Sequence, residues 1–163
     1  MAGATDILDT KSISAFIKND TSGNNLFLFY GEEEYFLELA IKALKKKYLG
    51  EGADSMDFVK LDFSDGKFDL AKVEDNILIP AWMSEKRIVV VNNAEIFSIS
   101  DPDKTFSESL KKLLSSVPDS CVLIFTETSI DKRKKAILKA FGDSGKIAEF
   151  SFMDDISLAK WID

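Results

Sequence analysis

One glycine and three glutamates directly follow an apolar run of strand length. Leu26–Tyr30 predicts a buried strand, and Gly31, Glu32, Glu33 and Glu34 come next, at the turn into a helical pattern. Phosphates are often bound at such a junction, because the first turn of a helix offers free backbone N–H groups. A phosphate-binding loop requires G-x-x-x-x-G-K-[ST]. This chain has one glycine, no lysine and three carboxylates there, so we predict the position of a nucleotide site without its chemistry.

The same three glutamates could instead hold Mg²⁺, as in phospho-acceptor receiver domains. Such a site needs an aspartate after a central strand, where this chain has Asn92 and Asn93. It also needs a lysine after the last strand, where Ser151 and Phe152 stand. Acidic residues in the first turn of a helix interact favourably with its dipole. We therefore favour a structural role for them and expect no metal site and no cofactor.

An apolar connection between a predicted helix and a predicted strand is the second candidate site. Pro80 should end the helix and leave residues 81–83 as a short turn. Trp82 and Met83 on an exposed turn would suit a partner's pocket, because buried aromatic anchors dominate many interfaces. The same two side chains could equally fill the core, and the residues alone leave both interpretations open.

Basic runs form a third candidate, since lysine and arginine contact nucleic-acid phosphates. One run is Lys132, Arg133, Lys134 and Lys135, and a second is 45–47. No aromatic residues alternate with them as a base-stacking surface would require. A solvated helix face is the alternative interpretation.

The composition limits the chemistry that these residues could perform. Among 163 residues there is no histidine, which removes the commonest general base and transition-metal ligand. A single cysteine, Cys121, lies in an apolar run and is expected to be buried. With 21 basic and 28 acidic residues the net charge is −7, which opposes non-specific binding to nucleic acid or to an anionic membrane.

Five apolar runs of strand length alternate with helical patterns. This alternation predicts an α/β fold with a mainly parallel five-stranded sheet and helices on both faces. The predicted strands are 26–30, 58–62, 87–91, 121–125 and 146–150, and the predicted helices are 12–18, 32–48, one capped by Asp69, 105–115 and 132–141. Ile77 and Leu78 are expected in the core.

Two further expectations concern domains and location. Residues 1–150 form one domain, and 151–163 resemble the interrupted start of a second, helical domain. The first residues lack the basic and apolar regions of a signal peptide, and no apolar run approaches the length of a membrane span. We expect a cytoplasmic protein with no membrane partner.

Three segments together resemble the delta subunit of the bacterial DNA polymerase III clamp loader. They are 28–35 (LFYGEEEY), 79–91 (IPAWMSEKRIVVV) and 131–135 (DKRKK), in that order on successive predicted elements. The resemblance covers most of the chain. It implies the N-terminal domain of an AAA+-like module with a degenerate nucleotide site, within a non-catalytic subunit of the polymerase holoenzyme.

The resemblance also implies a function in DNA replication. Such a subunit binds the ring-shaped sliding clamp and helps to open it without hydrolysing ATP itself. Its partners are the clamp, the other loader subunits and, through the complete complex, primed DNA. The family's apolar pair falls at Ala81 and Trp82, within a clamp-binding segment of Ile79, Pro80, Ala81, Trp82 and Met83. Ala81 is smaller than the family's usual residue, so Ile79 or Met83 should contribute.

Two alternatives stay open. The chain could be a divergent P-loop NTPase or a receiver-like signalling domain. Binding of Mg-ATP would favour the first, and phosphorylation by a small phosphodonor would favour the second.

Overall fold

A computed structural model gives the structure of the chain and describes residues 7–50, 56–95, 104–131, 138–141 and 145–151. Its centre is a six-stranded sheet in the order β1-β6-β2-β5-β4-β3, and every pair of neighbours is parallel. The strands are β1 (Ile7–Leu8), β2 (Leu26–Tyr30), β3 (Phe58–Asp62), β4 (Arg87–Asn92), β5 (Cys121–Glu127) and β6 (Lys146–Glu149).

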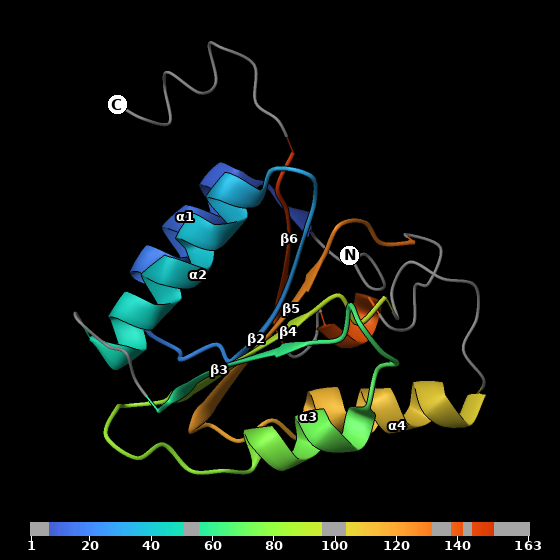
Figure 1. Cartoon of the computed structure of the whole chain (residues 1–163). Helices are drawn as coiled ribbons and strands as arrows, with labels where there is room; N and C mark the ends of the chain where they lie inside the picture. Colours follow the sequence, from blue (N-terminus) through green and yellow to red (C-terminus); the bar gives the residue numbers. More distant parts are fainter. Residues whose placement is uncertain (1–6, 51–55, 96–103, 132–137, 142–144, 152–163) are drawn as a thin grey trace.

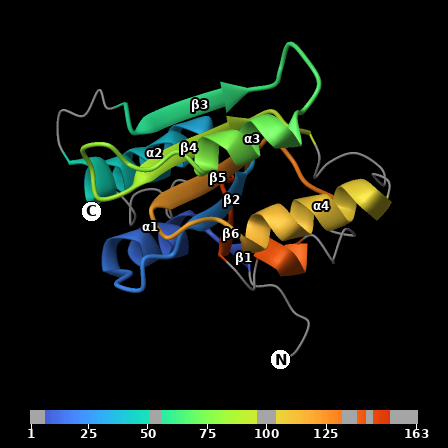
Figure 2. The same cartoon turned by 90° about the horizontal axis from the view of Figure 1, so that it is seen from below.

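Helices cover both faces of this sheet, as the alternating pattern predicts. Helices α1 (Thr10–Asn19) and α2 (Glu34–Leu49) lie on one face, and α3 (Leu70–Ile77) and α4 (Lys104–Ser115) lie on the other (Figure 1). Figure 2 shows the strands side by side from β3 to β1 between these helices. A parallel sheet needs such cover because both of its faces are apolar.

Alternate residues of each central strand point to opposite faces, which produces two separate hydrophobic clusters. One cluster packs Phe27 and Phe29 of β2 against α1 and α2. The other packs Leu26 and Leu28 of the same strand against α3 and α4. The central strands β2, β4 and β5 are therefore mainly continuous apolar runs, and the limits of the strands are close to those predicted.

The helices begin where capping side chains stand. The Asp9 carboxylate accepts from the amide of Ser12, and that of Asp69 accepts from the amide of Lys72. Glu33 caps α2 by accepting from the amide of Tyr35, so this helix starts at Glu34 and not at residue 32 as predicted. Capping of this kind satisfies amides that have no partner inside the helix.

Two sequence predictions about the fold are wrong in detail. The sheet has six strands and not five, because Ile7–Leu8 adds a short edge strand beside β6. Leu78 is not in the core: Ile77 ends α3 on its buried face, and the next residue lies outside the helical period with its side chain exposed.

In a parallel sheet, all strands end at one edge, here called the carboxyl edge, and begin at the opposite amino edge. Gly31–Glu33 follow β2 and lie at the carboxyl edge. The 78–86 connection precedes β4 and lies at the amino edge. The two main candidate sites are thus on opposite sides of the molecule.

Candidate partner-binding surface

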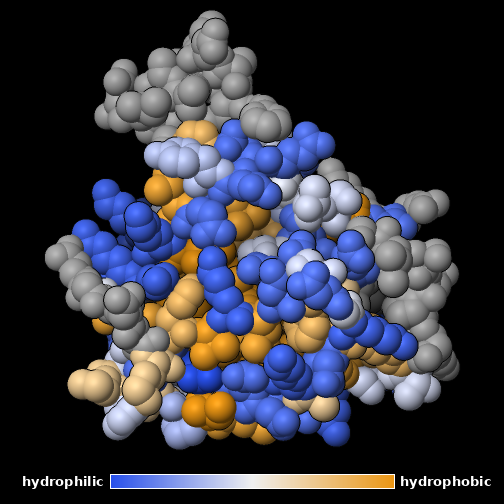
Figure 3. Space-filling model, viewed as in Figure 1, coloured by the Kyte–Doolittle hydropathy of each residue, from blue (hydrophilic) through white to orange (hydrophobic). Residues whose placement is uncertain are grey.

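The α3–β4 connection, residues 78–86, presents large apolar side chains to solvent. Trp82 is 67% exposed and Met83 is 86% exposed, and Leu78 and Ile79 are also exposed, while Ala81 is half-buried. Pro80 lies three residues beyond the end of α3. Figure 3 shows apolar atoms gathered at the lower left, where this connection runs in Figure 1. The two residues that sequence left undecided, Trp82 and Met83, therefore lie on the surface.

A buried carboxylate holds the backbone of this connection. One Asp57 oxygen, Oδ1, accepts from the amide of Trp82 at 2.6 Å, and the other, Oδ2, accepts from the amides of Met83 and Ser84, each at 2.9 Å. Burial opposes ionisation of Asp57, but these donors outweigh it and lower the pKa of its carboxyl group. The charged form is therefore favoured, although the residue is almost completely buried.

A buried guanidinium fixes the neighbouring chain. Arg87 Nε donates to the carbonyl of Asn76 at 3.0 Å, and its Nη2 donates to Asn76 Oδ1 at 3.2 Å. Its Nη1 donates to the carbonyl of Met56 at 3.1 Å. Arg87 therefore joins the end of α3 to the chain entering β3.

Met56 is an apolar surface residue that the sequence analysis did not single out. Its side chain is 66% exposed, and it lies directly before Asp57. Its position beside the connection depends on the contact between Arg87 and its carbonyl. No local pattern marks it, because that contact spans 31 residues of sequence. Here "apolar turn" means Leu78, Ile79, Trp82 and Met83 together with Met56.

At the carboxyl edge, three of the backbone amides after β2 already donate to main-chain carbonyls. Gly31 donates to the carbonyl of Glu127 at 3.1 Å, and Glu33 donates to the carbonyl of Phe150 at 3.1 Å. The amide of Glu34 donates to the carbonyl of Glu32. These are the amides that would cradle a phosphate. The structure thus brings the four predicted residues together in a compact turn packed on the ends of β5 and β6.

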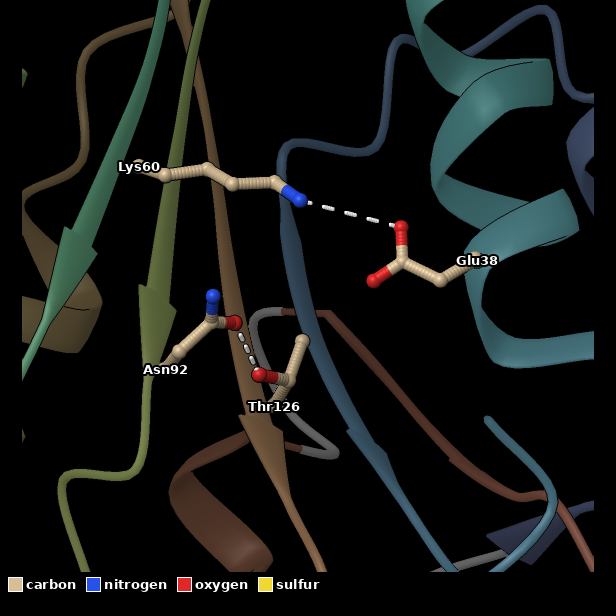
Figure 4. A network of polar contacts seen from close by, with 4 residues as sticks. All are labelled: Glu38, Lys60, Asn92 and Thr126. Atoms are coloured by element: carbon tan, nitrogen blue, oxygen red, sulfur yellow. Dashed lines mark hydrogen bonds and ion pairs between the residues drawn. The ribbon is translucent and has the colours of Figure 1, made fainter. Parts of the chain in front are cut away.

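β4 ends in an amide side chain, Asn92, and not in a carboxylate. Thr126 on β5 donates through its hydroxyl to Asn92 Oδ1, a short link between neighbouring strands (Figure 4). Asn93 donates to Asp62 at the end of β3. Figure 4 also shows Lys60 and Glu38, a 3.7 Å ion pair between β3 and α2. Both side chains are well exposed, so this pair contributes little stability.

Glu127 is a second residue that sequence reasoning missed, and it lies at the carboxyl edge. It ends β5, is buried, and both of its oxygens accept from the amide of Glu95 at 3.1 to 3.2 Å. Burial raises the pKa of this carboxyl group to about 7. An apolar run ending in Thr-Glu gives no sign that the glutamate side chain folds inward.

Of the two basic runs, the described residues include 45–47 but not 132–135. Lys132, Arg133, Lys134 and Lys135 lie outside the described residues, so the predicted basic face remains a prediction. In the other run, Lys47 donates to the carbonyls of Ile17 and Asp20, and so caps the end of α1.

Two absences apply to the part of the chain that the structure describes. No three His, Cys, Asp or Glu residues there come together as a metal site requires. No helix there is long and apolar enough to cross a membrane.

The strand order, the helices on both faces and the glycine turn after β2 define an α/β domain with an all-parallel sheet, which is consistent with the AAA+-like fold that the sequence predicts. The model of one family, described as "DNA polymerase III, delta subunit", matches residues 27–151. The match covers well over half of the chain, and the chain therefore belongs to the DNA polymerase III delta subunit family.

Solved structures agree at the level of the fold. The chain is similar to the Bacillus subtilis DNA clamp loader delta protein (YqeN), with a TM-score of 0.74 and 15% identity over 93% of this chain and 45% of that one. It is also similar to a Thermotoga maritima DNA polymerase III gamma subunit-related protein, with a TM-score of 0.59 and 13% identity over 90% of this chain and 47% of that one. The chain spans less than half the length of each. A search of curated proteins found no match.

Proposed function

We propose that this chain is the clamp-binding part of a clamp-loader delta subunit. Its apolar turn enters a pocket on the sliding clamp and helps to open the ring. The other loader subunits and primed DNA take part through the complete complex, and this chain does not hydrolyse ATP itself. Membership of the delta subunit family supports a role in a clamp loader. The exposed apolar turn supports binding through this surface.

The observation that carries the proposal is the exposure of Trp82 and Met83 on a turn whose backbone is fixed. Large apolar side chains in water are normally isolated or partly covered, and a cluster of them marks an interaction site. Trp82, Met83, Leu78 and Met56 are each more than half exposed. Their burial in a partner's pocket removes apolar surface from water, which is the main driving force for association.

Several features of the carboxyl edge support a role without nucleotide hydrolysis. The amides of Gly31 and Glu33 are engaged by neighbouring carbonyls, and Glu32 to Glu34 place negative charge where a triphosphate would lie. P-loop NTPases hold Mg²⁺ with a strand-end aspartate. Here β4 ends in Asn92, and Asn93 follows.

Ring opening follows only if the turn binds one state of the ring more tightly than the other, because a ligand shifts an equilibrium by its differential affinity. A rigid turn suits this role. It fits a pocket that is fully formed in the open ring and does not adapt to the closed one.

The test is the affinity of the chain for the cognate sliding clamp, measured by isothermal titration calorimetry. Trp82→Ala should weaken binding by about 2 kcal/mol or more, the range of interface hot spots. This corresponds to a Kd increase of about thirtyfold. Because Trp82 contributes little to the core, the variant should unfold at the same urea concentration as the parent.

The matched control is Tyr35→Ala. Tyr35 is an aromatic residue with nearly the same exposure, 66%, but it lies in the first turn of α2 at the carboxyl edge. Its removal should leave clamp affinity unchanged. Equal affinities for the parent and the folded Trp82→Ala variant would show that the apolar turn is not the clamp-binding element.

A further inference from the structure

We propose that Asp57 is a positioning residue, whose buried carboxylate holds the apolar turn in the shape that the partner binds. The inference rests on the proposed function for the identity of the partner. The inference goes beyond the proposed function because it assigns the rigidity of the surface to one side chain. That side chain contacts the turn from inside and does not itself face the partner.

The geometry shows one carboxylate serving three consecutive amides. Oδ1 accepts from Trp82, and Oδ2 accepts from Met83 and Ser84. Consecutive N–H groups that converge in this way form an anion-binding concavity. Here the anion belongs to the protein, and it comes from a residue 25 to 27 positions earlier in the sequence.

The carboxylate itself stands on a fixed base. The Asp57 carbonyl accepts from the amide of Ile88 at 2.7 Å, which joins it to the start of β4. The next residue, Phe58, begins β3 and pairs in register with Ile88. A shift of the turn relative to the sheet therefore requires breaking the contacts of the carboxylate.

Asp57 holds the tip of the turn, residues 82–84, while Lys86 holds its far end by donating to the carbonyl of Gly23 at 3.0 Å. Residues 82–86 belong to no helix or strand, and Trp82 and Met83 are exposed. A turn held only by solvent would have to be ordered when the partner binds, and that ordering weakens affinity. Asp57 removes this cost in advance without adding any contact to the interface.

The chemistry requires the ionised acid. A carboxylate offers only acceptors, whereas an asparagine amide replaces one oxygen with an NH₂ donor. In Asp57→Asn the remaining oxygen can accept either from the amide of Trp82 or from those of Met83 and Ser84. The NH₂ group, which is a donor, then faces the other N–H donors. This variant keeps the volume and shape of the residue and removes its ability to hold all three amides.

The test compares Asp57→Asn with the parent by hydrogen exchange and by clamp affinity. The amides of Trp82, Met83 and Ser84 should exchange at least about tenfold faster, and Kd for the cognate clamp should rise at least about tenfold, the loss expected for hydrogen bonds to a charged group. Amides of β4 and β5 should keep their protection. A purely structural role would instead change exchange across the sheet.

The matched control is Asp62→Asn. Asp57 directly precedes β3, and Asp62 ends that strand at the opposite edge of the sheet. Its Oδ1 accepts from the amide of Ser64 at 2.9 Å and from Asn93 at 3.1 Å. This substitution should leave both clamp affinity and exchange at 82–84 unchanged. An equal loss of affinity in the two variants would overturn the assignment to Asp57.

If Asp57→Asn unfolds the sheet, the same contact can be tested by removing one of its donors, the backbone amide of Ser84. Replacement of Ser84 by its α-hydroxy acid analogue converts that amide to an ester and deletes this N–H group without changing any side chain. The prediction is again faster exchange at 82 and 83 and weaker clamp binding, and unchanged values would overturn the proposal.

The two proposals fail in different ways. If Trp82→Ala weakens clamp binding and Asp57→Asn does not, the positioning role is wrong and the clamp-binding surface stands. If neither affects clamp binding but exchange at 82–84 still rises in Asp57→Asn, the proposed function is wrong and the hold of Asp57 on the turn stands. Unchanged exchange overturns the positioning role whatever the affinity.

Discussion

Glu127 makes the stability of this domain depend on pH. Its buried carboxyl group has a pKa raised by burial to about 7, against about 4.5 for an exposed glutamate. A raised folded-state pKa means that the protonated form is favoured in the folded state. Its contribution is fully present below about pH 4.5 and is lost as the pH rises through about 7.

We therefore predict that Glu127→Gln raises the free energy of unfolding at pH 8 by about 2 kcal/mol and flattens its dependence on pH between about 4.5 and 7. The glutamine keeps an oxygen for the amide of Glu95. Urea unfolding at several pH values measures the effect, and Glu74→Gln on the exposed side of α3 is the control. Parallel pH profiles for the parent and Glu127→Gln would contradict the prediction.

Residue types were easier to predict from the sequence than residue environments. The apolar run around the single cysteine, Cys121, predicted that it is buried, and the structure confirms this. The inward fold of Glu127 and of Asp57 could not be predicted, because each depends on amides 25 to 32 residues away. Local patterns carry no information about such partners.

At the scale of elements, Gly31 is required by the close approach of β2 and the end of β6. Its φ is +136°, and a Cβ there would lie 2.0 Å from the carbonyl oxygen of Phe150. The amide of Phe150 donates to the carbonyl of Tyr30 at 2.7 Å, and the amide of Glu33 donates to the carbonyl of Phe150. Gly31 stands where a nucleotide-binding loop would begin, and in this chain it allows the two backbone segments to pack closely.

Gly31→Ala should lower the free energy of unfolding by about 3 kcal/mol or more, because both the dihedral and the backbone contact are incompatible with a side chain. Gly66→Ala is the control, since a Cβ there would meet nothing within 4 Å. That change should be neutral or slightly stabilising. Urea midpoints measure both, and comparable midpoints for the two variants would show that the close approach is not as described.

Elements with strong periodic patterns were predicted well. β2 and β3 have the limits that the sequence indicated, and α3 begins after Asp69 as expected. β1 was missed because two residues carry no alternation of their own. The α3–β4 connection was placed correctly, but the exposure of its side chains depends on how its backbone is held by Asp57, and an apolar composition alone favours the core equally.

At the scale of the whole molecule, the two edges of the sheet present different surfaces. The carboxyl edge carries the closed turn after β2, with its acidic residues and engaged amides. The amino edge carries the apolar turn. We propose that the partner is contacted at the amino edge, while the carboxyl edge keeps only the position of a nucleotide site.

Site-directed photo-cross-linking can distinguish contact at the amino edge from contact at the carboxyl edge. Cys121 is fully buried, and burial raises the pKa of its thiol to about 12, so it should not compete with an introduced surface thiol. Glu85→Cys places a thiol beside the apolar turn, and Glu32→Cys places one at the carboxyl edge. Both glutamates are exposed.

Each variant is labelled with a benzophenone maleimide, mixed with the cognate sliding clamp and irradiated, and the covalent adduct is quantified by gel and mass spectrometry. We predict a clamp adduct from position 85 and none above background from position 32. An adduct that forms from position 32 as readily as from position 85, or only from position 32, would show that the apolar turn at the amino edge is not the specific contact surface.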